Sequence, residues 1–142
     1  MDAEVARTTS PWLADLTNVH ALVVDDDRDS LDLVRLLLEG AGARVTSVAS
    51  AREGLAAVGP FDVVISDIGM PDMDGYSFMR AMRAQDAAAN IPAIALTAYA
   101  RTEEAERALR AGYQEHPAKP VDAAKLLQAV ETWVRNGRGR EA

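Results

Sequence analysis

The sequence predicts an α/β domain built on a five-stranded parallel sheet with helices on both faces. Two observations support this prediction. Short apolar runs alternate along the chain with amphipathic segments of helical period, and the runs lack the polar alternation of a half-exposed strand. Strict alternation of strand and helix favours a doubly wound sheet, because a crossover between parallel strands needs a helix. At 142 residues the chain has room for one such domain.

The first half of the chain carries three apolar runs and two amphipathic segments. Leu31, Val34 and Leu38 recur at helical spacing, and Gly40 ends that segment. Ser50 is a typical N-cap residue for the next helix. The predicted elements are therefore a strand at 20–24, a helix ending at 40, a strand at 44–48, a short helix from 50 to about 58, and a strand at 61–66.

The second half continues the alternation after a loop at 67–74, which Gly69, Pro71 and the Asp74-Gly75 pair punctuate. Gly112 is the expected stop of one of its helices. The predicted elements are a helix at 76–84, a strand at 91–97, a helix at 102–111, a short fifth strand at 113–116 and a closing helix at 121–135.

The two ends of the chain lack sustained periodicity. We expect residues 1–19 to form a linker or N-terminal arm, from which Trp12, Leu13 and Leu16 dock on the domain. The domain proper is expected at 20–136. A polar C-terminal tail follows at 137–142.

Composition excludes several classes of function. The net charge of −7 disfavours a nucleic-acid partner, because a DNA-binding surface is normally basic. The absence of cysteine excludes a disulfide framework, a thiolate metal site and a cysteine nucleophile. No secretory signal or membrane-spanning run is present in the sequence, so we expect a cytoplasmic location without membrane contact.

Polar residues stand where the predicted strands end, which is where ligands bind in open parallel sheets. They are Asp25, Asp26 and Asp27 after the first strand, Asp67 after the third, Thr97 at the end of the fourth and Lys119 after the fifth. Carboxylates that converge from separate strands repel one another unless a cation lies between them, and their oxygens suit Mg²⁺. A metal, an ammonium and a hydroxyl around one carboxylate nucleophile indicate a phosphoryl-transfer centre.

Four motifs stand in order along nearly the whole chain. They are Val23-Val24-Asp25-Asp26-Asp27, Ser66-Asp67-Ile68-Gly69-Met70-Pro71-Asp72-Met73-Asp74-Gly75, Leu96-Thr97-Ala98 and Lys119-Pro120. Together they resemble the signature of CheY-like response-regulator receiver domains of two-component signalling. The resemblance covers about His20 to Arg135, and it implies the flavodoxin/CheY-like strand order 2-1-3-4-5.

The resemblance assigns the site residues one by one. Asp67 matches the phosphoacceptor, which takes its phosphoryl group from a partner's phosphohistidine. Asp25, Asp26 and Asp67 match the Mg²⁺ ligands, and the backbone carbonyl of Gly69 completes that set.

Two further matches complete the assignment. Thr97 and Lys119 match the hydroxyl and ammonium that contact the phosphoryl group. The family usually has a cis bond before the matching proline, so Lys119-Pro120 is a candidate for one.

Three positions set the expected variations on the family pattern. Where relatives usually carry Tyr or Phe as the switch residue, this chain has His116, followed by Pro117. Gly69 and Tyr99 occupy the positions that tune phosphoryl lifetime. Because Gly69 offers no side chain to orient a water molecule, we expect slow self-dephosphorylation.

The resemblance also implies partners. A histidine kinase or a phosphotransfer domain would donate the phosphoryl group, and a downstream protein would bind the face at 102–135. We expect a monomer or weak dimer that catalyses only its own phosphorylation and dephosphorylation. The amino-acid sequence at 95–100 is most like that of the receiver of a hybrid histidine kinase, and a stand-alone regulator is the alternative.

Other interpretations of the same residues remain open. Asp27 is expected to cap the first helix rather than bind metal. His20 is expected to start a strand, and Met70, Met73, Met79 and Met82 are expected to pack in the core. An enzyme with an aspartyl nucleophile, a phosphatase or phosphotransferase, is a further alternative. Such an enzyme would usually carry a second acid two residues after the nucleophile, where this chain has Gly69, so this alternative is weak.

Two more alternatives concern the whole chain. One is nucleotide binding through Gly40-Ala41-Gly42. This alternative is weak, because the segment follows a helix rather than a strand and lacks the third glycine of a nucleotide-binding loop. A receiver-like module that only binds protein partners, without phosphorylation, is the main alternative function.

Overall fold

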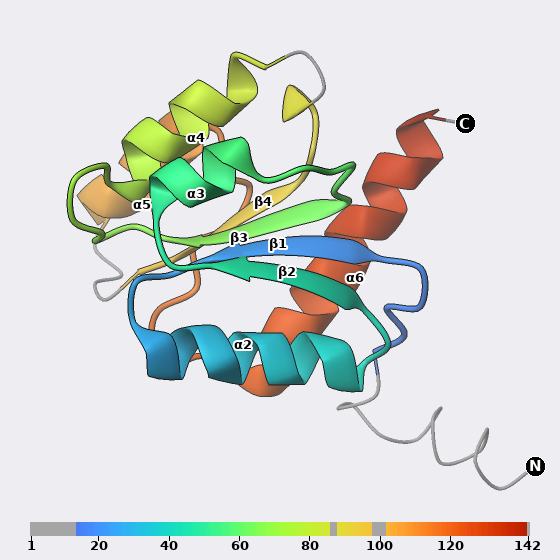
Figure 1. Cartoon of the computed structure of the whole chain (residues 1–142). Helices are drawn as coiled ribbons and strands as arrows, with labels where there is room; N and C mark the ends of the chain where they lie inside the picture. Colours follow the sequence, from blue (N-terminus) through green and yellow to red (C-terminus); the bar gives the residue numbers. More distant parts are fainter. Residues whose placement is uncertain (1–13, 86–87, 98–101, 142) are drawn as a thin grey trace, which may run out of the picture.

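Figure 1 shows the computed structural model, which describes residues 14–85, 88–97 and 102–141. Its four strands form one parallel sheet in the order β2-β1-β3-β4. The strands are β1 (His20–Val24), β2 (Arg44–Val48), β3 (Val63–Asp67) and β4 (Ala93–Leu96). The predicted α/β class and the first four positions of the predicted strand order are confirmed.

In the described part of the chain, five helices cover the two faces of the sheet. They are α2 (Arg28–Gly40), α3 (Ala51–Ala56), α4 (Gly75–Arg83), α5 (Thr102–Ala111) and α6 (Ala123–Glu141). Helices α2 and α6 pack on one face, and α3, α4 and α5 lie over the other (Figure 1). The molecule is therefore the predicted three-layer doubly wound domain.

The predicted fifth strand lies beside β4 but does not form a regular ladder. It makes two isolated bridges, between Ile94 and Glu115 and between Thr97 and Ala118. Pro117 lies between the two bridged residues and has no N–H to donate, which interrupts the ladder at that point. The segment occupies the expected edge position as an irregular strand.

Both faces of the central strands are buried, as their uninterrupted apolar sequences predict. In β1, Ala21 and Val23 pack into the core layer shared with α2 and α6, whereas Leu22 and Val24 pack into the layer beneath α3, α4 and α5. The predicted packing of the methionines is also observed. The buried ones are Met70, Met79 and Met82, and Met73 packs half-buried beside them.

Helices begin directly after the sheet edge that carries the polar residues. The side chain of Asp27 accepts a hydrogen bond from Asp29 N at the start of α2, which confirms the predicted cap. Asp74 caps α4 in the same way through Ser77 N. The first turns of α2 and α4 therefore flank the carboxyl ends of β1 and β3.

The folded unit extends beyond the predicted boundaries at both ends. Leu16 and Val19 are buried in the core, and Leu16 N donates to Ala41 O, so the predicted arm at 1–19 joins the domain by residue 16. The predicted docking of Trp12 and Leu13 lies outside the described residues.

At the other end, α6 continues to Glu141 instead of stopping near 135, so most of the predicted tail at 137–142 is helical. No helix in the described part of the chain combines the length and the apolar character needed to cross a bilayer.

Candidate functional site

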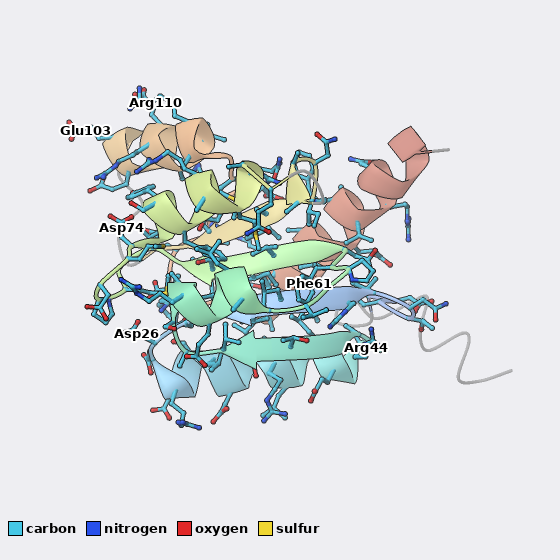
Figure 2. All side chains as sticks on the ribbon, turned by 45° about the horizontal axis from the view of Figure 1, so that its top comes forward. Asp26, Arg44, Phe61, Asp74, Glu103 and Arg110 are labelled. Carbon is cyan, nitrogen blue, oxygen red and sulfur yellow. The ribbon has the colours of Figure 1, made fainter. Side chains whose placement is uncertain are left out.

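The predicted polar residues meet at one edge of the sheet. Asp25 directly follows β1, and Asp67 is the last residue of β3. Asp67 pairs in register with Leu96, which places Thr97 immediately beyond the end of β4. Figure 2 shows Asp26 at this end of the sheet and Arg44, at the start of β2, at the other.

Three carboxylates lie close enough to share one ion. Single oxygen atoms of Asp25, Asp26 and Asp67 all lie within 4.8 Å of one another. The Asp25 side chain is fully buried and Asp67 is 7% exposed, whereas Asp26 is exposed. The cluster therefore has a buried floor and one open side toward solvent.

Lys119 brings an ammonium group into the same cluster. Its Nζ donates to Asp25 Oδ2 at 3.0 Å and lies 3.4 Å from Asp67 Oδ1. With all three aspartates ionised, one ammonium leaves the cluster with two uncompensated negative charges, which is the charge that a divalent cation neutralises.

The ionisation of Asp67 follows from these surroundings. Burial raises the pKa of the Asp67 carboxyl, and the charge of Asp25 raises it further, while Lys119 works in the opposite direction. Burial alone lowers the pKa of the Lys119 ammonium, but its hydrogen bond to Asp25 and the charges of Asp67 and Asp25 outweigh this, so the pKa of Lys119 is raised.

The donor set fits Mg²⁺. This ion prefers hard oxygen ligands and one or two carboxylates, and it keeps waters or a phosphate in its remaining positions. Asp25, Asp26 and Asp67 supply only oxygen, and the exposed side of Asp26 leaves room for water. Among the described residues, no other group of three histidine, cysteine or acidic side chains could hold a metal ion.

The backbone around Asp67 is held by several short contacts. Ile68 N donates to Asp67 Oδ1 at 2.9 Å, and Ser66 Oγ donates to the Asp67 carbonyl at 2.9 Å. Gly75, the first residue of α4, packs directly on this strand end, because a Cβ built on it would lie 2.4 Å from the Asp67 carbonyl oxygen. The Asp67 side chain therefore leaves a backbone that the start of α4 fixes in place.

Thr97 links the site to the irregular fifth strand. The residue is 7% exposed, its N–H donates to Pro117 O at 3.2 Å, and its carbonyl accepts from Lys119 N at 2.8 Å. The predicted cis bond at Lys119-Pro120 is present, and a second cis bond occurs at Gly59-Pro60. Thr97 and Lys119 are thus held together through their main chains.

The remaining predicted residues divide into three groups. Gly69 lies exposed in the loop after β3, and a Cβ built on it would meet nothing within 4 Å. His116 is half-buried in the irregular fifth strand, beside a groove that Lys125 and Gln128 of α6 also line. Tyr99 lies outside the described residues.

Two residues that support the site were not predicted from the sequence. Tyr113 was expected only to begin a strand, but it is buried and its hydroxyl donates to Gly75 O at 2.8 Å. Gly75 was expected only as a turn residue. A buried tyrosine needs a partner for its hydroxyl, which was the available signal, although the sequence does not identify that partner.

Comparison with known proteins then decides the family. The family model of the response regulator receiver domain matches residues 21–131, and the four motifs of the site lie within that span. The chain belongs to this family. It is a receiver domain of two-component signalling, and receiver domains bind Mg²⁺ at an acidic site of the kind seen here.

Curated relatives of the receiver domain differ in size. An uncharacterised 14.6 kDa protein of Leptolyngbya boryana is 41% identical over 120 residues, which are 83% of this chain and 92% of that protein. The sensor protein GacS of Pseudomonas syringae pv. syringae is 38% identical over 119 residues, which are 80% of this chain but only 13% of GacS. The receiver domain thus matches nearly all of one relative and a small part of the other.

Solved receiver structures agree with the fold. The receiver domain of sensor histidine kinase PA1611 from Pseudomonas aeruginosa PAO1, solved with a magnesium ion coordinated in its active site cleft, is 32% identical with a TM-score of 0.77. The match covers 82% of this chain and 98% of that one. Chemotaxis protein CheY4 of Vibrio cholerae is also 32% identical, with a TM-score of 0.78 over 81% of this chain and 98% of CheY4.

Proposed function

We propose that this receiver domain accepts a phosphoryl group on Asp67 in a Mg²⁺-dependent reaction, and that phosphorylation shifts a conformational switch read by a protein partner. The supporting observation is the cluster at the sheet edge. Asp25, Asp26 and Asp67 approach within 4.8 Å, and Lys119 Nζ lies 3.4 Å from Asp67 Oδ1. A nucleophile, a metal-ligand set and a cation for the phosphoryl group are thus in one place.

The transfer follows from the chemistry of these groups. A carboxylate oxygen of Asp67 forms a bond to phosphorus, the P–N bond of the donor's phosphohistidine breaks, and the imidazole nitrogen keeps the electron pair. Bound Mg²⁺ supplies positive charge that offsets the charge on the phosphoryl oxygens. Lys119 supplies a second positive charge, and Asp25 and Asp26 would hold the metal together with Asp67.

The reaction needs Asp67 as a carboxylate. Burial and the charge of Asp25 raise its pKa, so the free site disfavours the reactive form. A divalent cation between the acids reverses this effect, because it stabilises the charged form of each ligand. We therefore expect the phosphorylation of Asp67 to depend on a bound divalent cation.

The switch is proposed to run through Thr97 and Lys119. A phosphoryl group on Asp67 brings new acceptor oxygens to the Thr97 hydroxyl and the Lys119 ammonium. Charge-assisted hydrogen bonds of about 1.5–3 kcal/mol each are enough, taken together, for the ~5.5 kcal/mol that moves a two-state equilibrium from 1:99 to 99:1. Thr97 is joined by main-chain hydrogen bonds to Pro117 and to Lys119, which gives the change a path from the site toward the face at 102–135.

The relatives favour a histidine kinase or a phosphotransfer domain as the donor. GacS is a sensor protein and PA1611 is a sensor histidine kinase, and each contains a segment similar to this chain. The small protein of L. boryana matches over nearly its whole length, so a stand-alone regulator remains the alternative to a domain of a hybrid kinase. In either setting the proposed catalysis is limited to the domain's own phosphorylation and dephosphorylation.

Acetyl phosphate and intact-mass measurement test the acceptor directly. We expect one phosphoryl adduct in the presence of Mg²⁺, none with EDTA and none in the Asp67→Asn variant. Asp72→Asn is a matched control, because Asp72 is an exposed aspartate of the same loop and asparagine tolerates its positive φ of 68°. Asp26→Asn should keep the acceptor but weaken Mg²⁺ binding in calorimetry.

The main alternative is an interaction module that is not phosphorylated. It predicts no adduct with acetyl phosphate and none with a panel of phosphorylated kinases and phosphotransfer domains. That result would overturn the proposal, as would an adduct that persists in Asp67→Asn. The buried charge of Asp25, paired with Lys119 across the site, favours phosphorylation, because burying charged groups is costly and a binding surface elsewhere does not require it.

A further inference from the structure

A cleft lies near the amino-terminal end of β4, at the other end of the strands from the acidic cluster. It has a volume of about 780 Å³, in the range of small-molecule sites, and lies between the C-terminal ends of α4 and α5, the segment before β4, and α6. Its polar and aromatic lining consists of Arg80, Arg83, Arg110, Asn90, Gln114 and Trp133, among others. None of the residues assigned to phosphorylation lines it.

The cleft concentrates positive charge in an acidic protein. The whole chain carries a net charge of −7, yet among the described residues three arginines and no carboxylate line this cleft. Within the described part of the chain, no carboxylate forms an ion pair with Arg80, Arg83 or Arg110. Among the described residues, these guanidinium charges are therefore not paired with a carboxylate.

Arg83 is held in a fixed position. Its Nη1 donates to Ala88 O at 2.9 Å and its Nη2 donates to Gly112 O at 2.7 Å. Both partners are neutral carbonyls, and burial lowers the pKa of the guanidinium, while the neighbouring Tyr113 acts in the opposite direction. A half-buried arginine bound only to carbonyls keeps its full charge available to an anion in the cleft.

Trp133 supplies a flat apolar wall. Its indole Nε1 donates to the carboxylate of Glu115, so the N–H is already satisfied and the ring contributes carbon surface to the cleft. Gln114 uses its side-chain oxygen to accept from Ala93 N at 2.6 Å, which leaves its amide N–H groups as donors. One aromatic wall thus stands beside three guanidinium groups and amide donors.

We propose that this cleft binds a nucleotide, with its phosphates on the arginines and its base against Trp133. Guanidinium groups match phosphate oxygens bidentately, and an indole ring stacks on a planar base. An acidic peptide would also be attracted to the arginines, but it would not need an aromatic wall beside them. The proposed site shares no residue with the phosphorylation site at Asp67.

Tryptophan fluorescence and calorimetry provide the test. In a Trp12→Phe background, Trp133 is the only tryptophan, since the chain has two. ATP, GTP, ADP and inorganic tripolyphosphate are titrated in EDTA, so that binding through Mg²⁺ at the acidic cluster does not contribute. We expect nucleotides to quench Trp133 and to bind with measurable heat, and tripolyphosphate to bind at least about tenfold more weakly, because it lacks the base.

Charge reversal distinguishes the cleft from general attraction. Arg80→Glu combined with Arg110→Glu should weaken nucleotide binding by about tenfold or more, the loss expected for one charge-assisted hydrogen bond. Both side chains are exposed, and circular dichroism checks that the variant folds. Arg52→Glu, an equally exposed reversal on α3, should leave nucleotide affinity within about twofold, since it changes the net charge without touching the cleft.

Several results would overturn the proposal. These are the absence of heat and quenching at millimolar nucleotide, equal binding of tripolyphosphate and ATP, and equal weakening by Arg52→Glu and by the cleft variant. Binding of an acidic peptide that exceeds that of every nucleotide would overturn it in favour of a protein partner. Phosphorylation of Asp67 by acetyl phosphate, measured on the same cleft variant, should be unchanged.

Discussion

Lys119 and Asp25 are 94 residues apart in sequence, yet Lys119 Nζ lies 3.0 Å from Asp25 Oδ2. The Asp25 side chain has no exposed surface, and the Lys119 side chain is 21% exposed. This pair ties the end of β1 to the segment before α6, across the floor of the acidic cluster. It also provides the positive charge that the three neighbouring carboxylates need when no metal is bound.

Lys119→Ala should destabilise the metal-free domain. The substitution leaves the buried Asp25 carboxylate without its donor, which we expect to lower the free energy of unfolding by about 1–3 kcal/mol in urea denaturation. Saturating Mg²⁺ should recover part of this loss, because the dication replaces the missing positive charge. Lys125→Ala, an exposed lysine of α6, serves as the control and should change stability by less than about 0.5 kcal/mol. Equal losses in both variants would contradict the role of the pair.

Asp67→Asn should stabilise the metal-free domain in a pH-dependent way. The pKa of Asp67 is raised on folding, so the native state holds this proton more tightly than the unfolded chain does. Its contribution to stability is therefore full below the unfolded value of about 3.8 and is lost as the pH rises through the folded pKa. The Asn variant should melt above the wild type at pH 7, and the difference should shrink as the pH falls toward 4. A difference that grows on acidification would refute this sign.

Gly75→Ala should damage both the fold and the site. The new Cβ would lie 2.4 Å from Asp67 O and 2.7 Å from Ile68 Cα, and backbone atoms cannot move aside cheaply. We expect a loss of about 1–3 kcal/mol in denaturation and weaker Mg²⁺ binding in calorimetry. Gly69→Ala is the matched control, because its Cβ would meet nothing within 4 Å. If both glycines tolerate alanine equally, the close contact at Gly75 is not a constraint.

His116→Ala should separate phosphorylation from its readout. His116 lies beside Glu115, whose carboxylate accepts from Trp133 Nε1, so Trp133 fluorescence reports on this segment. We expect Asp67 to be phosphorylated to the same extent by acetyl phosphate, while the fluorescence change on phosphorylation falls at least about twofold. The same fluorescence change in wild type and variant would remove His116 from the switch.

The ordered motifs predicted the site because each stands at a strand end, and parallel strands bring such ends to one edge. Asp25 and Thr97 directly follow apolar runs, and Asp67 follows an apolar run that ends in Ser66, so the sequence placed them without knowledge of long-range contacts. The cap at Asp27 was predictable for the same local reason, since a short acid before an amphipathic run is a typical N-cap.

Long-range contacts were not predictable in the same way. Tyr113 and Gly75 are 38 residues apart, and only the folded chain shows that the hydroxyl of one bonds the carbonyl of the other. The short fifth strand predicted at 113–116 forms only isolated bridges, Ile94 to Glu115 and Thr97 to Ala118, on either side of Pro117. Helix α6 was predicted too short, since its last turns lack the apolar residues on which the prediction depended.

The close packing of Gly75 on Asp67 has a consequence for how the molecule moves. The carbonyl of Asp67 and Gly75, the first residue of α4, leave no free space between them. We therefore expect the end of β3 and the start of α4 to move together as one rigid part. The Tyr113 hydroxyl, which donates to Gly75 O, links this part to the irregular fifth strand. A displacement of the Asp67 carboxylate should therefore move the start of α4 as well as the loop between β3 and α4. We expect relaxation dispersion to find residues 67 and 75 exchanging at one common rate.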